Sequence, residues 1–323
     1  MPNEQTPSPG ALMAIGGAED KLGRRSVLNA FVEYAGGEDA RIAVVPTASS
    51  LGPEIIDVYA ALFRKLGAAE VFGARPESRD QANDPDVVGR LDDVTGIFMT
   101  GGNQLKLSAV VSGTDFGEAI RAAHRRGVVV GGTSAGASIQ SSHMLAFGSG
   151  GATPKQRMTQ LAAGLGLVHN CVIDQHFDQR NRYGRLLMIV AQSPSLIGVG
   201  VDEDTAAVIT GEGDDQILSV LGRGAVTILD GANIVSNAHE ARRTAPLLAS
   251  GVVLHVLPTG SAFNMRTRTL VQGDAVVDQS DTDELAVANR DLRRLARDIA
   301  SGDVSPSVFR RRRARQRTEG DHA

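Results

Sequence analysis

The sequence predicts an α/β protein with three layers, in which a mostly parallel sheet is flanked by helices on both faces. In the first half, short apolar runs alternate with amphipathic stretches of helix length, which is typical of strand–helix–strand units. The runs are apolar throughout rather than at every second residue, as expected for parallel strands buried on both faces. The second half has short strands and tight turns instead, and we expect these to form antiparallel strands added to the sheet.

The elements of the first half follow one another regularly. Strands are expected where apolar residues run together, at 11–15, 41–46, 70–73, 96–100 and 127–131. Between them, apolar residues recur at helical spacing, which predicts helices at 20–35, 53–67, 104–111 and 116–126.

The pattern changes in the second half. Residues 148–154 (GSGGATP) predict a flexible loop, residues 165–173 a strand and residues 178–191 a helix. From about residue 197, short strands and turns indicate hairpins, and residues 282–300 predict a last amphipathic helix. The chain contains no internal repeat and no linker that would separate two domains.

The composition is that of an ordinary globular protein, with 42% hydrophobic and 22% charged residues among 323. No apolar run approaches the roughly 18 to 20 residues of a membrane span, and the polar start lacks the features of a signal peptide. The one cysteine, Cys171, excludes an intramolecular disulfide. We therefore expect a cytoplasmic protein with a flexible N-terminus at 1–10, a single α/β domain at 11–300 and a disordered arginine-rich tail at 301–323.

Charge is distributed unevenly along the chain. The 33 basic and 37 acidic side chains give a net charge of −4, although six arginines lie between residues 310 and 317. Without residues 310–323, 27 basic and 35 acidic side chains remain. A body of this sign is a poor general binder of polyanions, so we expect no specific binding of nucleic acid. The tail is either a solvated terminus or a segment that binds polyanions.

A candidate nucleophile follows the strand expected at 127–131. Residues 132–136 (GTSAG) match the pattern G-x-S-x-G, which in this position predicts a sharp strand-to-helix turn with Ser134 at its tip. Small neighbours allow strained backbone angles there, and the N–H of Ala135 then points at a developing oxyanion. The alternative is a glycine-rich turn in which the serine only caps a helix.

A serine nucleophile needs a base and an orienting acid. Of the seven histidines, only His176 lies in a dense polar segment, residues 174–185 (DQHFDQRNRYGR), which follows a predicted strand. Open α/β sheets place their sites at such strand ends. Residues 198–205 (GVGVDEDT) offer three acids after another apolar run. The order serine, histidine, acid differs from that of α/β-hydrolases and disfavours an ordinary esterase.

A second turn is a candidate for completing the oxyanion hole. Residues 100–104 (TGGNQ) open a predicted helix, so the N–H groups of Gly102 and Asn103 join that of Ala135 as candidates. The glycine patterns of dinucleotide and phosphate loops are absent from the sequence. Because no histidine or cysteine pair has the spacing of metal ligands, we expect no metal and no cofactor.

Six motifs between residues 12 and 265 resemble, in order, those of the cyanophycinases, serine peptidases related to the aspartyl dipeptidases. They are residues 14–20 (AIGGAED), 45–49 (VPTAS), 101–104 (GGNQ), 132–137 (GTSAGA), 174–177 (DQHF) and 200–205 (GVDEDT). The resemblance implies a class I glutamine-amidotransferase-like fold and a homodimer. It also implies hydrolysis of cyanophycin, an aspartate backbone with arginine on each side-chain carboxylate, to β-Asp-Arg dipeptides through an acyl-enzyme.

The resemblance also implies a role for individual residues. Ser134 would be the nucleophile, His176 the base and Glu203 the orienting acid. The substrate pocket would be lined by Gln104, Asp174, Gln175, Arg180, Arg182 and Arg185.

Charge and spacing add expectations about this pocket. Arginines suit the carboxylates of the substrate, and Asp174 suits a guanidinium. We expect a helix from about Asp178 to carry the three arginines, with Arg182 and Arg185 on one face and Arg180 diverging from them. The alternative is that the arginines form a solvated helix face.

Strand alternation adds an expectation about the acid. Side chains alternate along a strand, so we expect Glu203 to point away from both flanking aspartates, Asp202 and Asp204. Only one of the two faces can meet the imidazole, and the resemblance assigns that position to Glu203.

Two other functions remain open. The first is an aspartyl or isoaspartyl dipeptidase-like serine peptidase, which would act on short peptides; the histidine segment with its arginines favours cyanophycinase. The second is a non-catalytic protein that binds polyanions through its arginine-rich tail.

Overall fold

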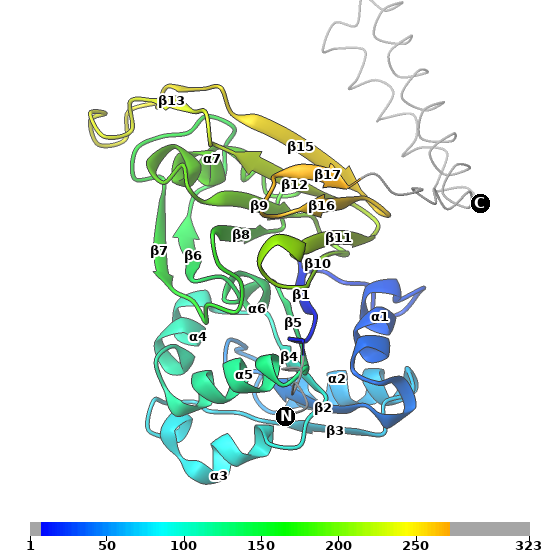
Figure 1. Cartoon of the computed structure of the whole chain (residues 1–323). Coiled ribbons are helices and arrows are strands. Elements are labelled where there is room, and N and C mark those ends of the chain that lie inside the picture. The colour runs from blue at the N-terminus through cyan, green and yellow to red at the C-terminus, as the bar shows by residue number, and fades with distance from the viewer. Residues whose placement is uncertain (1–7, 272–323) are drawn as a thin grey trace, which may run out of the picture. The chain divides into compact units, whose positions relative to one another are not determined.

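Five parallel strands lie side by side in the first half of the chain, as a computed structural model that describes residues 8–271 shows (Figure 1). In their order across the sheet they are β1 (Leu12–Ile15), β5 (Val129–Thr133), β4 (Gly96–Met99), β2 (Arg41–Val45) and β3 (Glu70–Gly73). Each lies close to an expected strand, so the parallel half of the sheet is as predicted.

Helices cover both faces of this half-sheet. One face carries α1 (Ser26–Tyr34) and α2 (Glu54–Lys65), and the other carries α4 (Gln104–Val111) and α5 (Asp115–Arg125). Successive residues of β2 point to opposite faces: Val44 packs with Phe31 of α1, and Val45 joins the core on the side of α4 and α5. Both faces are therefore apolar, which explains why the strands lack alternation. The short helices α3 (Pro85–Val88) and α6 (Ala135–Ser138) complete this half.

Antiparallel strands extend the same sheet beyond β1. In order they are β10 (Thr205–Thr210), β11 (Ile217–Gly222), β16 (Ala262–Asn264) and β17 (Thr269–Val271). Within residues 8–271 the sheet thus has nine strands.

We expected all the remaining strands to join this sheet, and this prediction was wrong. A second sheet has the order β15 (Val253–Pro258), β12 (Ala225–Asp230), β9 (Ile197–Val201), β8 (Cys171–Gln175), with β8 and β9 parallel. Its outer face packs against α7 (Tyr183–Gln192). Two hairpins stand apart, β6 (His143–Gly148) with β7 (Thr159–Ala163), and β13 (Val235–Ser236) with β14 (Ala249–Ser250).

Three predicted boundaries were wrong, and local contacts explain two of them. The helix expected from residue 20 begins at Ser26, because the Asp20 carboxylate accepts the N–H groups of Leu22, Gly23 and Arg25 and holds a turn. The helix expected from about residue 178 begins at Tyr183, because Asn181 has a φ of +47°, which a right-handed helix does not tolerate. The strand expected at 165–173 is β8, which begins only at Cys171 and continues to Gln175.

The described part of the chain does not include every predicted segment. Residues 1–7 and 272–323, with the helix predicted at 282–300 and the arginine-rich tail at 301–323, lie outside it. The domain limits at 11 and 300 therefore stay predictions. None of the described helices is long and apolar enough to cross a membrane.

Candidate active site

Ser134 lies at the tip of a strained turn between β5 and α6. Its φ of +54° and ψ of −107° are angles that few residues other than glycine adopt. Its N–H donates to the Ile15 carbonyl at 2.9 Å. The flanking glycines have no room for a side chain, since a Cβ on Gly132 would lie 2.2 Å from the Gly136 oxygen, and one on Gly136 the same distance from the Met99 oxygen. The motif G-x-S-x-G therefore has the backbone form expected of a nucleophile turn.

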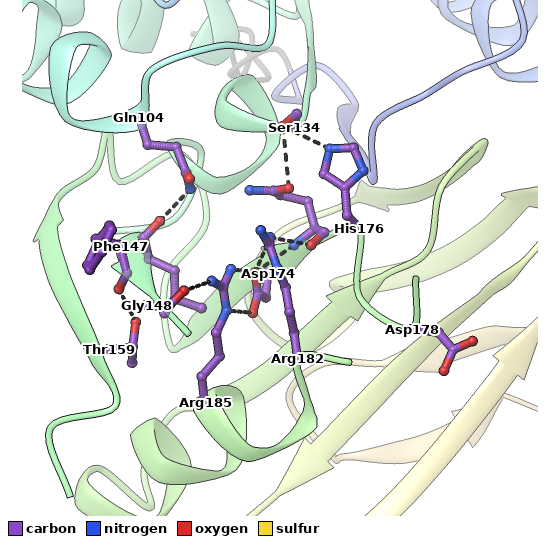
Figure 2. A network of polar contacts seen from close by, with 12 residues as sticks. Gln104, Ser134, Phe147, Gly148, Thr159, Asp174, His176, Asp178, Arg182 and Arg185 are labelled. Carbon is purple, nitrogen blue, oxygen red and sulfur yellow. Dashed lines mark hydrogen bonds and ion pairs between the residues drawn. The ribbon is translucent and has the colours of Figure 1, made fainter. Parts of the chain in front are cut away.

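His176 and Glu203 complete a hydrogen-bonded row with this serine. The His176 Nε2 atom lies 3.2 Å from Ser134 Oγ, and its Nδ1 atom lies 2.5 Å from Glu203 Oε1. Figure 2 shows the imidazole beside Ser134. His176 directly follows β8. Glu203 is the second residue after β9, the parallel neighbour of β8. The structure thus brings together three residues predicted from separate motifs; their catalytic roles stay a prediction.

Glu203 faces the imidazole for a reason other than strand alternation. Strand β9 ends at Val201, so residues 202–204 form a turn, and the strand expected there does not exist. The carboxylate of Asp202 accepts the N–H groups of Asp178 and Ala225, and that of Asp204 accepts the N–H of Asp20. Both aspartates thus hold backbone N–H groups, and Glu203 is the acid of this turn that contacts the imidazole.

The surroundings of His176 favour its neutral form. The side chain is nearly buried, and burial lowers its pKa below the ordinary value. The hydrogen bond from the imidazole to Glu203 acts in the opposite direction, and the charge of Arg180 adds to the lowering. A neutral imidazole at neutral pH can accept the proton of a serine hydroxyl.

The proposed oxyanion hole needs one correction. A Cβ on Gly101 would lie 3.2 Å from Ser134 Cβ, so the turn before α4 does reach the serine. The Asn103 N–H, however, already donates to the Ala48 carbonyl at 2.7 Å, and the Asn103 side chain caps α4 by accepting the N–H of Lys106. Asn103 is therefore not a donor for an oxyanion. Gly102 stays a candidate, as does Ala135, whose N–H has no acceptor within α6 because it is the first helical residue.

A buried ionic cluster adjoins the row. Asp174, with no exposed surface, accepts from Nε and Nη2 of Arg185 and from Nη1 of Arg182. Arg182 also donates to the Gln175 carbonyl, and Arg185 to that of Gly148. Figure 2 shows both arginines converging on the aspartate. Two guanidinium groups and one carboxylate leave an excess positive charge, and burial together with the neighbouring arginines lowers the pKa of Arg182 to about 10.

Arg182 and Arg185 converge and Arg180 diverges from them, as expected from their spacing. The helix that was expected to carry all three arginines begins only at Tyr183. Arg182 and Arg185 are buried, which rules out a solvated helix face for them, and they meet at one carboxylate. Arg180 precedes α7 and is exposed.

The two glutamines expected in the pocket also lie near these groups. Gln175 Oε1 is 3.3 Å from Ser134 Oγ, and Gln104 donates to the Leu145 carbonyl. One contact that sequence reasoning missed is that of Gln179, which accepts the Glu203 N–H at 2.9 Å. Its position inside the polar segment after His176 was the available signal. Among residues 8–271 no group of histidine, cysteine or acidic side chains could hold a metal ion.

An α/β fold with a serine, a histidine and a carboxylate in one hydrogen-bonded row defines a serine-type hydrolase. Comparison with known proteins narrows this class: the family model of Peptidase family S51 matches residues 11–217, and the chain belongs to that family.

The proteins that this chain is similar to include two cyanophycinases and one peptidase of known structure. The cyanophycinase of Geminocystis herdmanii (strain PCC 6308) is 38% identical over 265 residues, which cover 81% of this chain and 96% of that protein. The cyanophycinase of Thermosynechococcus vestitus (strain NIES-2133 / IAM M-273 / BP-1) is 40% identical over 260 residues, 80% of each chain. The crystal structure of a peptidase from an acI-B1 Actinobacterium matches with a TM-score of 0.56 and 22% identity, over 77% of this chain and 98% of that one. This last match supports the fold.

Proposed function

We propose that this protein is a serine exopeptidase that hydrolyses cyanophycin to β-Asp-Arg dipeptides through an acyl-enzyme. The observation that carries the proposal is the row of Ser134, His176 and Glu203 beside a buried cluster with excess positive charge. The similarity to two proteins named cyanophycinase, over four-fifths of the chain, supports this substrate.

The row accounts for both halves of such a reaction. Ser134 Oγ attacks the carbonyl carbon of a peptide bond of the aspartate backbone, while His176 Nε2 takes the hydroxyl proton and then gives it to the leaving amine. Water, activated by the same imidazole, then hydrolyses the acyl-enzyme and frees the serine. Glu203 holds Nδ1–H and stabilises the imidazolium that forms in each half. The N–H groups of Gly102 and Ala135 stabilise the oxyanion.

The cluster accounts for recognition of the polymer. Each arginine of cyanophycin keeps a free carboxylate, and such a carboxylate would neutralise the excess charge of the cluster. Arg182 is suited to receive it: its Nε and Nη2 groups have no partner among the described residues, and neither atom is fully enclosed. Asp174 then serves to hold the two arginines rather than to bind a substrate guanidinium, because both its oxygens already accept hydrogen bonds from them.

Gln104, Gln175 and Arg180 have lesser parts in this proposal. The two glutamines provide polar contacts near the reacting bond, where Gln175 lies beside Ser134. The exposed Arg180 attracts carboxylates farther along the polymer.

The decisive experiment is to incubate the purified protein with cyanophycin and to measure β-Asp-Arg by chromatography. Ser134→Ala should lose at least about 10³-fold in rate while the protein stays folded. A serine-directed reagent that labelled another residue of the active enzyme would contradict the assignment.

The same assay separates the alternatives. Faster turnover of Asp-X or isoaspartyl dipeptides than of the polymer would identify a dipeptidase-like enzyme. Deletion of residues 310–323 should leave hydrolysis intact, whereas a polyanion-binding protein would lose its binding.

We also propose that the protein is a cytoplasmic homodimer. A single cysteine suits a reducing compartment. Among the strands of the described part of the chain, β15 lies at the edge of its sheet and exposes Val253, Leu254 and Val256, and such an apolar edge favours association with a second copy. Light scattering of the purified protein tests this.

A further inference from the structure

The end of β1 and the two residues that follow it contact the backbone at Ser134, at His176 and in the turn that carries Glu203. The Ser134 N–H donates to the Ile15 carbonyl at 2.9 Å, the His176 N–H to the Gly16 carbonyl at 2.7 Å, and the Asp204 N–H to the Gly17 carbonyl at 2.9 Å. A Cβ on Gly17 would lie within 2.4 Å of the imidazole. Residues 15–17 therefore set the spacing between the serine, the histidine and the turn that carries Glu203.

A buried carboxylate ties this segment to the nucleophile turn by a side-chain contact. Glu19 is only 4% exposed, and its Oε2 atom accepts a hydrogen bond from Thr133 Oγ1 at 2.5 Å. Its Oε1 atom accepts from the Tyr59 hydroxyl at 2.6 Å and from Lys21 Nζ at 2.8 Å. Thr133 is the last residue of β5 and directly precedes Ser134.

Glu19 is ionised in this setting. Burial alone raises its pKa, but the charge of Lys21 and the hydrogen bonds from Lys21, Thr133 and Tyr59 leave the pKa below the ordinary value. A buried carboxylate with these donors forms strong, short hydrogen bonds, so Thr133 is held firmly.

We propose that Glu19 is a positioning residue that acts through Thr133 to hold Ser134 at its strained angles. A residue at a positive φ keeps that conformation only when its surroundings fix it from several sides. Here the Ser134 N–H bond to Ile15 fixes the backbone of the turn, and the Thr133 hydroxyl bond to Glu19 fixes the side chain of the preceding residue. The inference rests on the proposed function, because it assumes that Ser134 is the nucleophile.

The carboxylate offers a matched pair of variants. Thr133→Val and Tyr59→Phe each remove one hydroxyl donor to Glu19, but only Thr133 adjoins the nucleophile. A merely structural role predicts that both variants lose thermal stability and keep their rates once folded. A positioning role predicts that Thr133→Val alone slows the reaction of Ser134.

The experiment measures the rate at which a fluorophosphonate labels Ser134, and kcat and KM on a small activated ester, in the full-length protein. We expect Thr133→Val and Glu19→Gln to lower the labelling rate and kcat about tenfold or more, with KM little changed. Thr133→Ser, which keeps the hydroxyl, should restore them, and Tyr59→Phe should match the wild type. Thermal unfolding confirms that each variant is folded.

Two results would overturn the inference: wild-type labelling and kcat in folded Thr133→Val, or an equal loss in Tyr59→Phe. The proposed function fails separately. If Ser134 is labelled but cyanophycin is not hydrolysed, the substrate proposal falls and the effect of Glu19 is still measured. If the wild-type protein is not labelled at Ser134, both proposals fall.

Discussion

The catalytic row and the arginine cluster are neighbours, yet they are held in place by different forces. In the row, backbone geometry positions the side chains: Ser134 and His176 both have positive φ angles, and Gly17 packs against the imidazole. In the cluster, charge does so, since Arg182 and Arg185 are fixed by one buried carboxylate. Under the proposed function, reactivity depends on the fold around two strand ends, and selectivity depends on a few ion pairs. The two properties should separate under mutation.

The largest separation is expected for Glu203→Gln. The amide can no longer stabilise the imidazolium, so kcat should fall on the order of 10³- to 10⁴-fold, and equally on cyanophycin and on a small ester. Steady-state kinetics on both substrates measures this. Asp202→Asn is the control, because within residues 8–271 the Asp202 carboxylate accepts hydrogen bonds from backbone N–H groups and from no side chain. A larger loss in Asp202→Asn than in Glu203→Gln would refute the assignment of the acid.

The cluster should show a smaller and selective effect. Arg182→Lys removes the planar guanidinium that can bind a carboxylate through two hydrogen bonds. We expect it to cost about 1 to 3 kcal/mol, roughly 5- to 150-fold, in kcat/KM for cyanophycin. Hydrolysis of a small ester, which lacks those carboxylates, should change little.

Arg185→Lys extends this test to the second arginine of the cluster. The loss of kcat/KM on cyanophycin is compared with the loss on the small ester. Equal losses on polymer and ester would show that the cluster only stabilises the fold. Wild-type cleavage of the polymer by both variants would remove the basis for carboxylate recognition here.

The smallest effect is expected from Arg180, an exposed charge outside the cluster that acts on His176. Burial and, to a smaller extent, the charge of Arg180 hold the pKa of His176 below its ordinary value. We therefore expect the imidazole to stay unprotonated, and kcat/KM to stay high, at a pH somewhat below the ordinary pKa of histidine. Arg180→Gln removes that charge and should raise the pKa, which moves the acid limb of the pH profile upward. Arg180→Lys keeps the charge and serves as the control. A profile that does not move in Arg180→Gln would show that solvent screens this interaction fully.

Local sequence was enough to predict most of the fold and the strand-to-helix turn that carries Ser134. Continuous apolar runs gave the five parallel strands, and the glycines around Ser134 indicated the turn. These features depend on residues that are close in sequence. A strand buried on both faces must be apolar throughout. The turn admits only glycine at positions 132 and 136, because a Cβ there would lie 2.2 Å from a backbone oxygen.

Local sequence patterns did not predict the contacts between segments that are distant in the sequence. The second sheet depends on how β8, β9, β12 and β15 pair, which spacing along the chain does not specify. That Asn103 donates to Ala48 and that Asp174 holds two arginines also follow from tertiary packing. Residue types at this site reveal the chemistry available. Which of them face the substrate and which stabilise a neighbour is decided only when buried polar groups find their partners in the folded chain.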